Sequence, residues 1–297
     1  MDYRIPHKMK SAKEFEVQGK ALHSIQIYKS LIDEYPDYYD AYLHLAELYE
    51  RLGSIDAAKS VFEIVLNLQN SENDIKLYYG QFLMRTSEWN NAIDVFRKIS
   101  ADDEPICSYF VGYLYLLLKD YEATKVHLLN FIISDEGQEL IYEAYFYLAK
   151  AEFELNQYDN SLKYLKKAEV LLSDYWELYV QYAKTYYSLS MQNHAIKSIK
   201  KAISINSKEP LVYYWAGKIF FSNSEMNKAI ENYTHFLKLN EKITSDELIN
   251  RANNLTRLGK LKEALVTFQK AEILNSNLIN ASEAITKSKI ILDKKII

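Results

Sequence analysis

The sequence predicts an all-α protein, an α-solenoid of about eight stacked helix–turn–helix units. The first observation is a residue pattern that recurs about every 34 residues from Ala12 to Ala271. The second is that 297 residues include only 7 glycines and 4 prolines, so turn-forming residues are scarce. A unit this short cannot bury its own apolar face, and neighbouring units must therefore share one core.

The first helix of each predicted unit is marked by a small residue, which allows two helix backbones to approach closely. The small residues are Ala12, Ala46, Gly80, Gly112, Ala149, Ala183, Gly217 and Ala252. A large apolar residue follows three positions later on the same helix face in every unit except the fifth, where Glu152 stands. We expect Phe153 to take the place of Glu152 in packing.

The second helix repeats a small-to-large step with a spacing of four residues, which places both side chains on one helix face. The small members are Ser24, Ala58, Ala92, Thr124, Ser161, Ala195, Ala229 and Ala264. Turn residues fall between the helices or between the units, at Gly19, Gly53, Gly259, Pro36, Pro105 and Pro210.

This pattern resembles the tetratricopeptide repeat (TPR) family, whose unit is a helix–turn–helix of about 34 residues. The best match runs from Asp40 to Tyr49 and continues with Gly53, Ala58 and Phe62. The resemblance implies a right-handed solenoid and a protein-binding function. The units it predicts lie near residues 5–38, 39–72, 73–104, 105–138, 142–175, 176–209, 210–244 and 245–276.

Two regions depart from the regular array. The stretch from Asp135 to Glu139 lengthens one interval, so we expect an extended helix or a loop there. The apolar pattern of residues 277–297 predicts an amphipathic helix. We expect this helix to cap the last open face, because a repeat array needs a covered end. The alternative to a cap is that the apolar residues near Ile297 form a contact with a partner or with a second copy of the chain.

In the resembling family, the first helices line a concave groove, and the exposed positions follow from their offsets to the small residue. These offsets predict an aromatic groove in this chain, formed by Tyr78, Tyr109, Phe110, Tyr113, Phe146, Tyr147, Phe153, Tyr187, Tyr214, Trp215 and Phe221. The alternative is that several of these rings pack between helices, since aromatic stripes at helical spacing are often core.

Three lysines directly follow the small residue in consecutive units, at Lys150, Lys184 and Lys218. Equivalent positions in a repeat array form a ladder, so the three ammonium groups are expected to face the same groove beside aromatic rings. Such a surface suits an extended or helical peptide that carries acidic groups. The alternative is that the three lysines are simply solvated.

The charge distribution is uneven. Residues 1–150 carry 15 basic and 24 acidic side chains, whereas residues 151–297 carry 21 basic and 16 acidic. The formal net charge of −4 disfavours a nucleic-acid binder, although helical repeats with lysines and aromatic rings keep that function as a less favoured alternative.

The sequence shows no catalytic motif, such as a glycine-rich phosphate loop or a His-Glu-x-x-His helix. The six histidines lie too far apart in the sequence for a local metal pair, and the single cysteine, Cys107, is expected to pack in the core. We therefore expect a non-enzymatic scaffold or adaptor with no cofactor and no metal. Glu152 is expected to be exposed, because an unpaired glutamate is rarely buried.

Residues 1–13 are charged and lack an apolar segment of signal-peptide length, and no long apolar run follows. These features predict a cytoplasmic protein that does not insert into a membrane. The second functional hypothesis is a self-associating component of a larger assembly, in which the oppositely charged halves of two copies attract each other.

Overall fold

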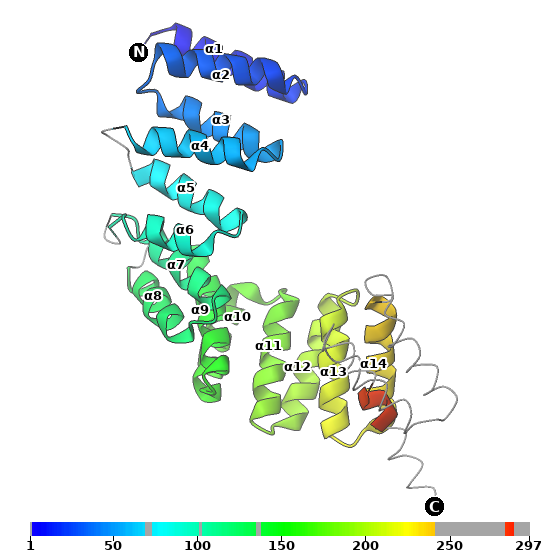
Figure 1. Ribbon diagram of the computed structural model, residues 1–297. Helices are drawn as coiled ribbons and strands as arrows, with labels where there is room; N and C mark the ends of the chain where they lie inside the picture. Colours follow the sequence, from blue (N-terminus) through cyan, green and yellow to red (C-terminus); the bar gives the residue numbers. More distant parts are fainter. Residues whose placement is uncertain (1, 69–72, 101–102, 135–137, 241–282, 288–297) are drawn as a thin grey trace, which may run out of the picture. The chain divides into compact units, whose positions relative to one another are not determined.

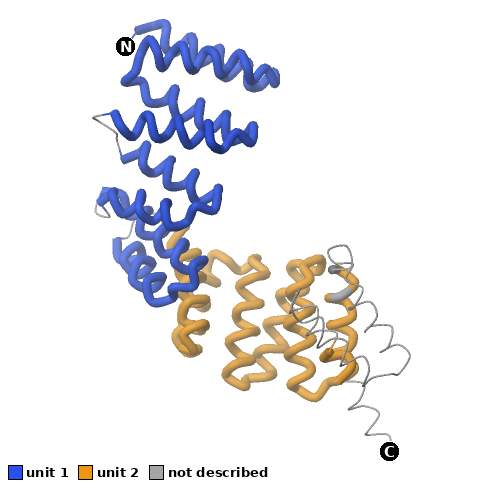
Figure 2. The backbone as a smooth tube through the Cα atoms, in the orientation of Figure 1, with its two compact units in different colours: residues 1–136 blue, residues 137–297 orange. Residues whose placement is uncertain are grey.

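The computed structural model describes residues 2–68, 73–100, 103–134, 138–240 and 283–287, and the regular elements in these ranges are all α-helices (Figure 1). The helices pack in consecutive pairs, which confirms the predicted all-α repeat architecture. The chain divides into two units, residues 1–136 and residues 137–297 (Figure 2).

The first unit contains four helix pairs. Their helices are α1 (Arg4–Val17), α2 (Ala21–Glu34), α3 (Tyr39–Arg51), α4 (Ile55–Leu66), α5 (Asn73–Arg85), α6 (Trp89–Phe96), α7 (Ile106–Leu117) and α8 (Tyr121–Ile133). Each pair packs against the next, and α3 also contacts α5, so that first helices of neighbouring pairs touch.

The described residues of the second unit form three helix pairs and one further helical turn at residues 283–287. Its helices are α9 (Gln138–Glu154), α10 (Tyr158–Leu172), α11 (Trp176–Ser188), α12 (Gln192–Ile205), α13 (Pro210–Ser222) and α14 (Met226–Asn240). The first helices α9, α11 and α13 contact one another in sequence order.

The predicted role of the small residues is confirmed by the spacing between paired helices. A Cβ atom added to Gly80 would lie 2.4 Å from the ring of Phe96, and one added to Gly217 would lie 2.6 Å from the ring of Tyr233. In both pairs the large residue comes from the second helix. Larger side chains at these positions would therefore push the two helices apart.

The turns inside the pairs also follow the repeat. Gly19 and Gly53 have positive φ angles of 72° and 75°, a conformation that glycine adopts at little cost. The same turn in later pairs uses non-glycine residues with φ near 60°, as at Lys119 and Ser190. These turns keep the backbone path of the repeat although the glycine is absent.

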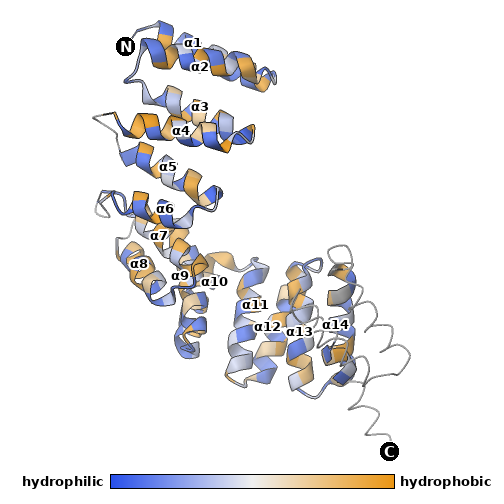
Figure 3. Ribbon diagram, in the orientation of Figure 1, coloured by the Kyte–Doolittle hydropathy of each residue, from blue (hydrophilic) through white to orange (hydrophobic). Residues whose placement is uncertain are grey.

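The buried apolar side chains form clusters between the helices. Figure 3 shows that each helix carries both hydrophilic and hydrophobic residues. In the first unit one cluster runs from Ile5 to Leu114 and includes Cys107, as predicted. Burial raises the pKa of the Cys107 thiol to about 12, so this cysteine is a packing residue at neutral pH.

The lengthened interval near residue 135 is followed by α9, which has 17 residues and is the longest helix in the part of the chain that the structure describes. The predicted eighth unit at 245–276 lies outside the described residues, as does most of the predicted helix at 277–297. Within the latter, residues 283–287 are helical, and Ile285 is buried in the cluster that contains Phe220 and Tyr233.

Candidate partner-binding site

The four predicted groove residues of the first unit do not form one exposed surface. Tyr109 is buried, with its ring 5.3 Å from that of Phe131, and Phe110 stacks on Phe96 at 5.2 Å. Both rings of α7 therefore pack against second helices. Tyr109 is a core residue, which corrects the prediction that it is exposed, whereas Phe110 is half-buried. Tyr113 is half-buried, and Tyr78 on α5 is 44% exposed.

Two of the predicted residues in the second unit are also core residues. Phe146 on α9 is 3% exposed and lies edge-on to Tyr175, while Tyr214 on α13 is 9% exposed and packs against Phe236. Tyr147 and Phe221 are half-buried. Phe146 and Tyr214 thus pack between helices, as the alternative to the exposed groove predicted.

The lysines and the remaining rings of the second unit come together across the first helices. The ammonium nitrogen of Lys184 lies 4.7 Å from the ring centre of Phe153 and 5.4 Å from that of Trp215. The ammonium nitrogen of Lys218 lies 4.6 Å from the ring of Trp215 and 5.4 Å from that of Tyr187. Both cations therefore occupy positions of favourable cation–π attraction.

Lys150 extends this arrangement on α9, with its ammonium nitrogen 5.4 Å from the ring centre of Phe146. We call the set the lysine–aromatic row. It consists of Lys150, Phe153, Lys184, Tyr187, Trp215 and Lys218.

The repeat itself produces the row. Phe153 and Tyr187 each lie four residues after the small residue of their helix. The ring of each makes a cation–π contact with the lysine 31 residues later, which belongs to the first helix of the next pair. Because α9 contacts α11 and α11 contacts α13, equivalent positions give equivalent contacts. The sequence predicts the ladder of three lysines from their own spacing of 34 residues.

The electrostatic state of the row reflects its partial burial. Burial lowers the pKa of Lys184, Glu154 opposes this shift, and the neighbouring charges of Lys150 and Lys218 lower it further. Burial also lowers the pKa of Lys218. An anion placed beside the row would relieve the repulsion between the ammonium groups and stabilise their charged forms.

Two glutamates of α9 differ from what the sequence predicts: Glu154 was not predicted as a neighbour of the row, and Glu152 was expected to be exposed. Glu154 at the end of α9 lies 3.9 Å from the ammonium nitrogen of Lys184 and is 43% exposed, which makes it a weak internal counter-ion. Glu152 is buried, with 3% of its surface exposed, so the expectation of an exposed carboxylate was wrong. Its position on α9 faces the interior between the buried Ala149 and Ala151 and the half-buried Leu155.

Five of the six histidines have an aromatic ring as a neighbour in the described structure. His23, His44, His127, His194 and His235 each lie beside an aromatic ring, with ring centres between 4.2 and 5.9 Å apart. The described residues contain no group of three or more histidine, cysteine, aspartate or glutamate side chains with metal-binding geometry. None of the described helices combines the length and the apolar character that a membrane crossing requires.

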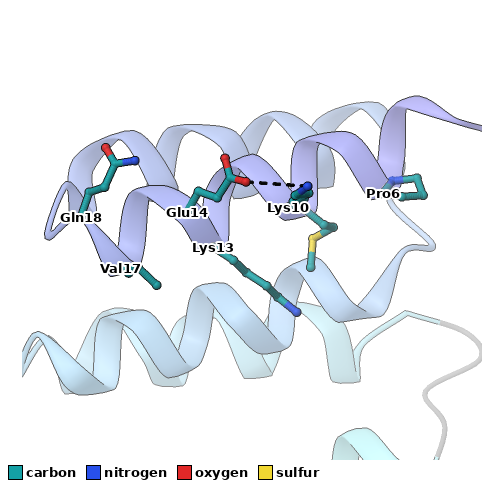
Figure 4. A pocket seen from close by; sticks show the side chains of 7 residues that line it. Pro6, Lys10, Lys13, Glu14, Val17 and Gln18 are labelled. Atoms are coloured by element: carbon teal, nitrogen blue, oxygen red, sulfur yellow. Dashed lines mark ion pairs between the residues drawn. The ribbon is translucent and has the colours of Figure 1, made fainter.

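A separate cleft of about 560 Å³ lies along α1 and is lined by residues of that helix, among them Met9, and by Gln18 directly after it. Figure 4 draws the seven lining side chains and labels Pro6, Lys10, Lys13, Glu14, Val17 and Gln18. Lys10 and Glu14 form an ion pair at 4.0 Å across one helical turn, and Val17 is 89% exposed. This face of the first helix is thus open in the described structure.

Comparison with known proteins agrees with the helix pairs and the spacing of small residues. Family models of the tetratricopeptide repeat match residues 18–76, 143–168, 177–209 and 211–243. The chain belongs to the tetratricopeptide repeat family. The matches include all but the first residue of α11 and of α13, so the tetratricopeptide repeat units carry Lys184, Trp215 and Lys218 of the row.

Solved structures resemble the chain at the level of the fold. A tetratricopeptide repeat protein from Parabacteroides merdae ATCC 43184 has a TM-score of 0.58 and 17% identity, covering 83% of this chain and 96% of its own. The C-terminal part of a repeat-containing protein from Cytophaga hutchinsonii has a TM-score of 0.59 and 15% identity, with coverages of 80% and 96%. A MamA fragment from Desulfovibrio magneticus RS-1 has a TM-score of 0.53 and 15% identity, with coverages of 59% and 99%. No curated protein sequence matches this tetratricopeptide repeat chain.

Proposed function

We propose that this protein is a non-enzymatic interaction scaffold that binds an acidic segment of a protein partner along the lysine–aromatic row. The tetratricopeptide repeat fold is of the protein-interaction scaffold kind. The observation that carries the finer proposal is the position of Lys184 and Lys218 against the faces of Phe153, Tyr187 and Trp215.

The chemistry of the row supports an acidic partner. A cation over an aromatic face keeps N–H donors that point away from the ring, and these remain able to bind a carboxylate. The rings supply rigid contact area at low entropic cost. Only one weak internal counter-ion, Glu154, contacts Lys184 among the ion pairs of the described row.

The test is affinity capture from a lysate of the source cell with the protein and with a variant that carries Lys150→Glu, Lys184→Glu and Lys218→Glu. The matched control carries Lys163→Glu, Lys200→Glu and Lys208→Glu, which make the same charge change at exposed positions outside the row. A partner lost only from the row variant supports the proposal, and the expected loss of affinity is about 100-fold.

Because Lys184 is mostly buried, the row variant needs a folding control. Replacement of the three lysines by glutamine avoids a buried acid, and circular dichroism should show unchanged helix content. If a folded glutamine variant captures the same partners with the same affinity as the unaltered chain, the row is not the binding surface.

A second candidate function is self-association, which is favoured by the open cleft on α1. The exposed Val17 beside this cleft offers apolar surface, and residues 1–150 and 151–297 carry opposite net charges that attract between copies. Light scattering across a range of protein concentrations tests it. A monomeric mass at the highest concentration would exclude self-association as the main role.

A further inference from the structure

The second unit contains a cleft that is separate from the lysine–aromatic row. It has a volume of about 410 Å³, and its lining residues come from α10, α11 and α12. Three tyrosines of α11, Tyr179, Tyr182 and Tyr186, contribute to it. A cavity of this size is in the range of sites that hold a small ligand or the anchor side chain of a peptide.

The cleft and the row lie on different sides of α11. Tyr179, Tyr182 and Tyr186 are spaced by three and four residues and so share one helix face. Lys184 is two residues from both Tyr182 and Tyr186, which places it about 200° around the helix from either of them. A ligand in the cleft therefore would not compete directly with one on the row.

The tyrosines are held in place by a carboxylate. The hydroxyl of Tyr179 donates to one oxygen of Glu169 at 3.0 Å, and the hydroxyl of Tyr182 donates to the other oxygen at 3.0 Å. Burial, followed by the bond to Glu169, raises the pKa of Tyr179 to about 12, so its hydroxyl stays a donor at neutral pH. Each oxygen of Glu169 thus accepts a hydrogen bond, and these two bonds hold the carboxylate beside the tyrosines.

The rings also present ordered faces. Tyr182 and Tyr186 are stacked with ring centres 5.9 Å apart, and Tyr186 lies 5.1 Å from the ring of His194. Tyr182 is buried, while Tyr179 and Tyr186 remain half-buried. The cleft thus offers aromatic surface to a further ring by stacking or edge-to-face contact.

Cations stand on both sides of this aromatic surface. Lys166 contributes from α10, and Lys197 and Lys201 contribute from α12. All three are exposed, and the ammonium nitrogen of Lys201 lies 5.7 Å from the ring centre of Tyr179. Three ammonium groups against the single carboxylate of Glu169 give the lining of the cleft an excess of positive charge.

We propose that this cleft is a second docking site, which takes an aromatic side chain of a protein partner flanked by acidic residues. The ring stacks in the tyrosine-lined cleft, and the flanking carboxylates pair with Lys166 on one side and with Lys197 and Lys201 on the other. Charge complementarity selects an acidic segment over a basic one.

The experiment uses a fluorescein-labelled peptide, Gly-Asp-Glu-Phe-Glu-Asp-Gly, and fluorescence anisotropy with the full chain. All measurements are made in a background that carries Lys150→Gln, Lys184→Gln and Lys218→Gln, so that binding to the row does not contribute. Two further peptides replace the phenylalanine by alanine or the acidic residues by lysine.

The expected result is saturable binding in this background, which the added pair Lys197→Glu and Lys201→Glu weakens by about tenfold or more. The control pair Lys163→Glu and Lys200→Glu, on α10 and α12 but outside the cleft, is expected to change affinity by less than about twofold. The alanine peptide should bind about tenfold more weakly, because the aromatic anchor is lost.

Three outcomes overturn the proposal. They are absence of binding in the glutamine background, equal loss from the two lysine pairs, and equal affinity for the phenylalanine and alanine peptides. Each is separable from failure of the proposed function, because that function predicts loss of a partner from substitutions in the row, which the background already contains.

Discussion

The two units use the same positions of their first helices in different ways. In the first unit, Arg51 pairs with Glu16, and Arg85 pairs with Glu50 through two hydrogen bonds of 2.7 and 2.8 Å. Each pair joins neighbouring first helices.

In the second unit, the positions that correspond to Glu16 and Glu50 hold Phe153 and Tyr187, which face Lys184 and Lys218. A guanidinium that forms a bidentate pair with a carboxylate is largely satisfied within the protein. A lysine on a ring face keeps donors for an external anion. The difference shows that the repeat backbone determines which helices touch. The residue types then determine whether the charged groups at the contact are paired within the protein or keep hydrogen-bond donors for a partner.

The largest expected effect probes the close helix packing that both units share. Gly80→Val in the first unit and Gly217→Val in the second are each expected to lower the free energy of unfolding by about 3 kcal/mol, because the new side chain collides with Phe96 or Tyr233. Urea denaturation followed by circular dichroism measures both.

The control for this pair is Gly53→Ala, where a Cβ meets no atom within 4 Å but the positive φ angle remains. It is expected to cost about 1 kcal/mol from backbone strain alone. A cost for Gly217→Val no larger than that of the control would contradict the close packing.

An intermediate effect is expected from the closed contact of the first unit. Arg85→Glu should lower the free energy of unfolding by about 1 kcal/mol, since Glu50 would then face a like charge at a site where its side chain is 19% exposed. The charge-swapped double variant Glu50→Arg with Arg85→Glu should recover most of this loss. Urea denaturation at low and high salt tests it, and a loss that high salt leaves unchanged would argue against an electrostatic origin.

The smallest effect concerns the lysines of the second unit. Burial lowers the pKa of Lys184 and Lys218 in the folded state, so between that lowered pKa and the ordinary lysine pKa the unfolded chain binds more protons. Stability contributed by these lysines should therefore rise with pH in this window, by less than about 1 kcal/mol.

The measurement compares the protein with a Lys184→Met and Lys218→Met variant in urea from neutral to alkaline pH, so that other titrating groups cancel. Relative stability of the unaltered protein should increase with pH. A relative decrease would show that the folded state favours the charged lysines. Affinity for an acidic partner is expected to fall as the pH rises through the same window, because the lysines lose their positive charge.

The candidate site was predicted in part, and its errors have a common cause. Lys150, Lys184 and Lys218 were placed together from their spacing, because equivalent positions in adjacent repeats must be neighbours. Tyr109, Phe146 and Tyr214 were assigned to the exposed groove by the same offsets, yet they point into the core. Each of these rings lies three residues before the small residue, near the edge of the buried face, where sequence spacing does not define the direction of a large side chain.

Glu152 and the tyrosine cleft show the same limit. Glu152 occupies a position that is interior in the other repeats. We expected it to be exposed because it is charged, but in the packed structure it is buried between α9 and its neighbours. The lysines around the cleft come from α10 and α12, and no local pattern joins them to the tyrosines of α11.

Residue periodicity was sufficient for the helices, their pairing, the small contact positions and the lysine ladder, because a short repeat can bury its apolar face only by stacking on its neighbours. The direction of each ring, the cation–π contacts of Trp215 with two lysines and the burial of Glu152 required the packed helices. These features depend on distances between side chains of different helices, and only the assembled repeats define those distances.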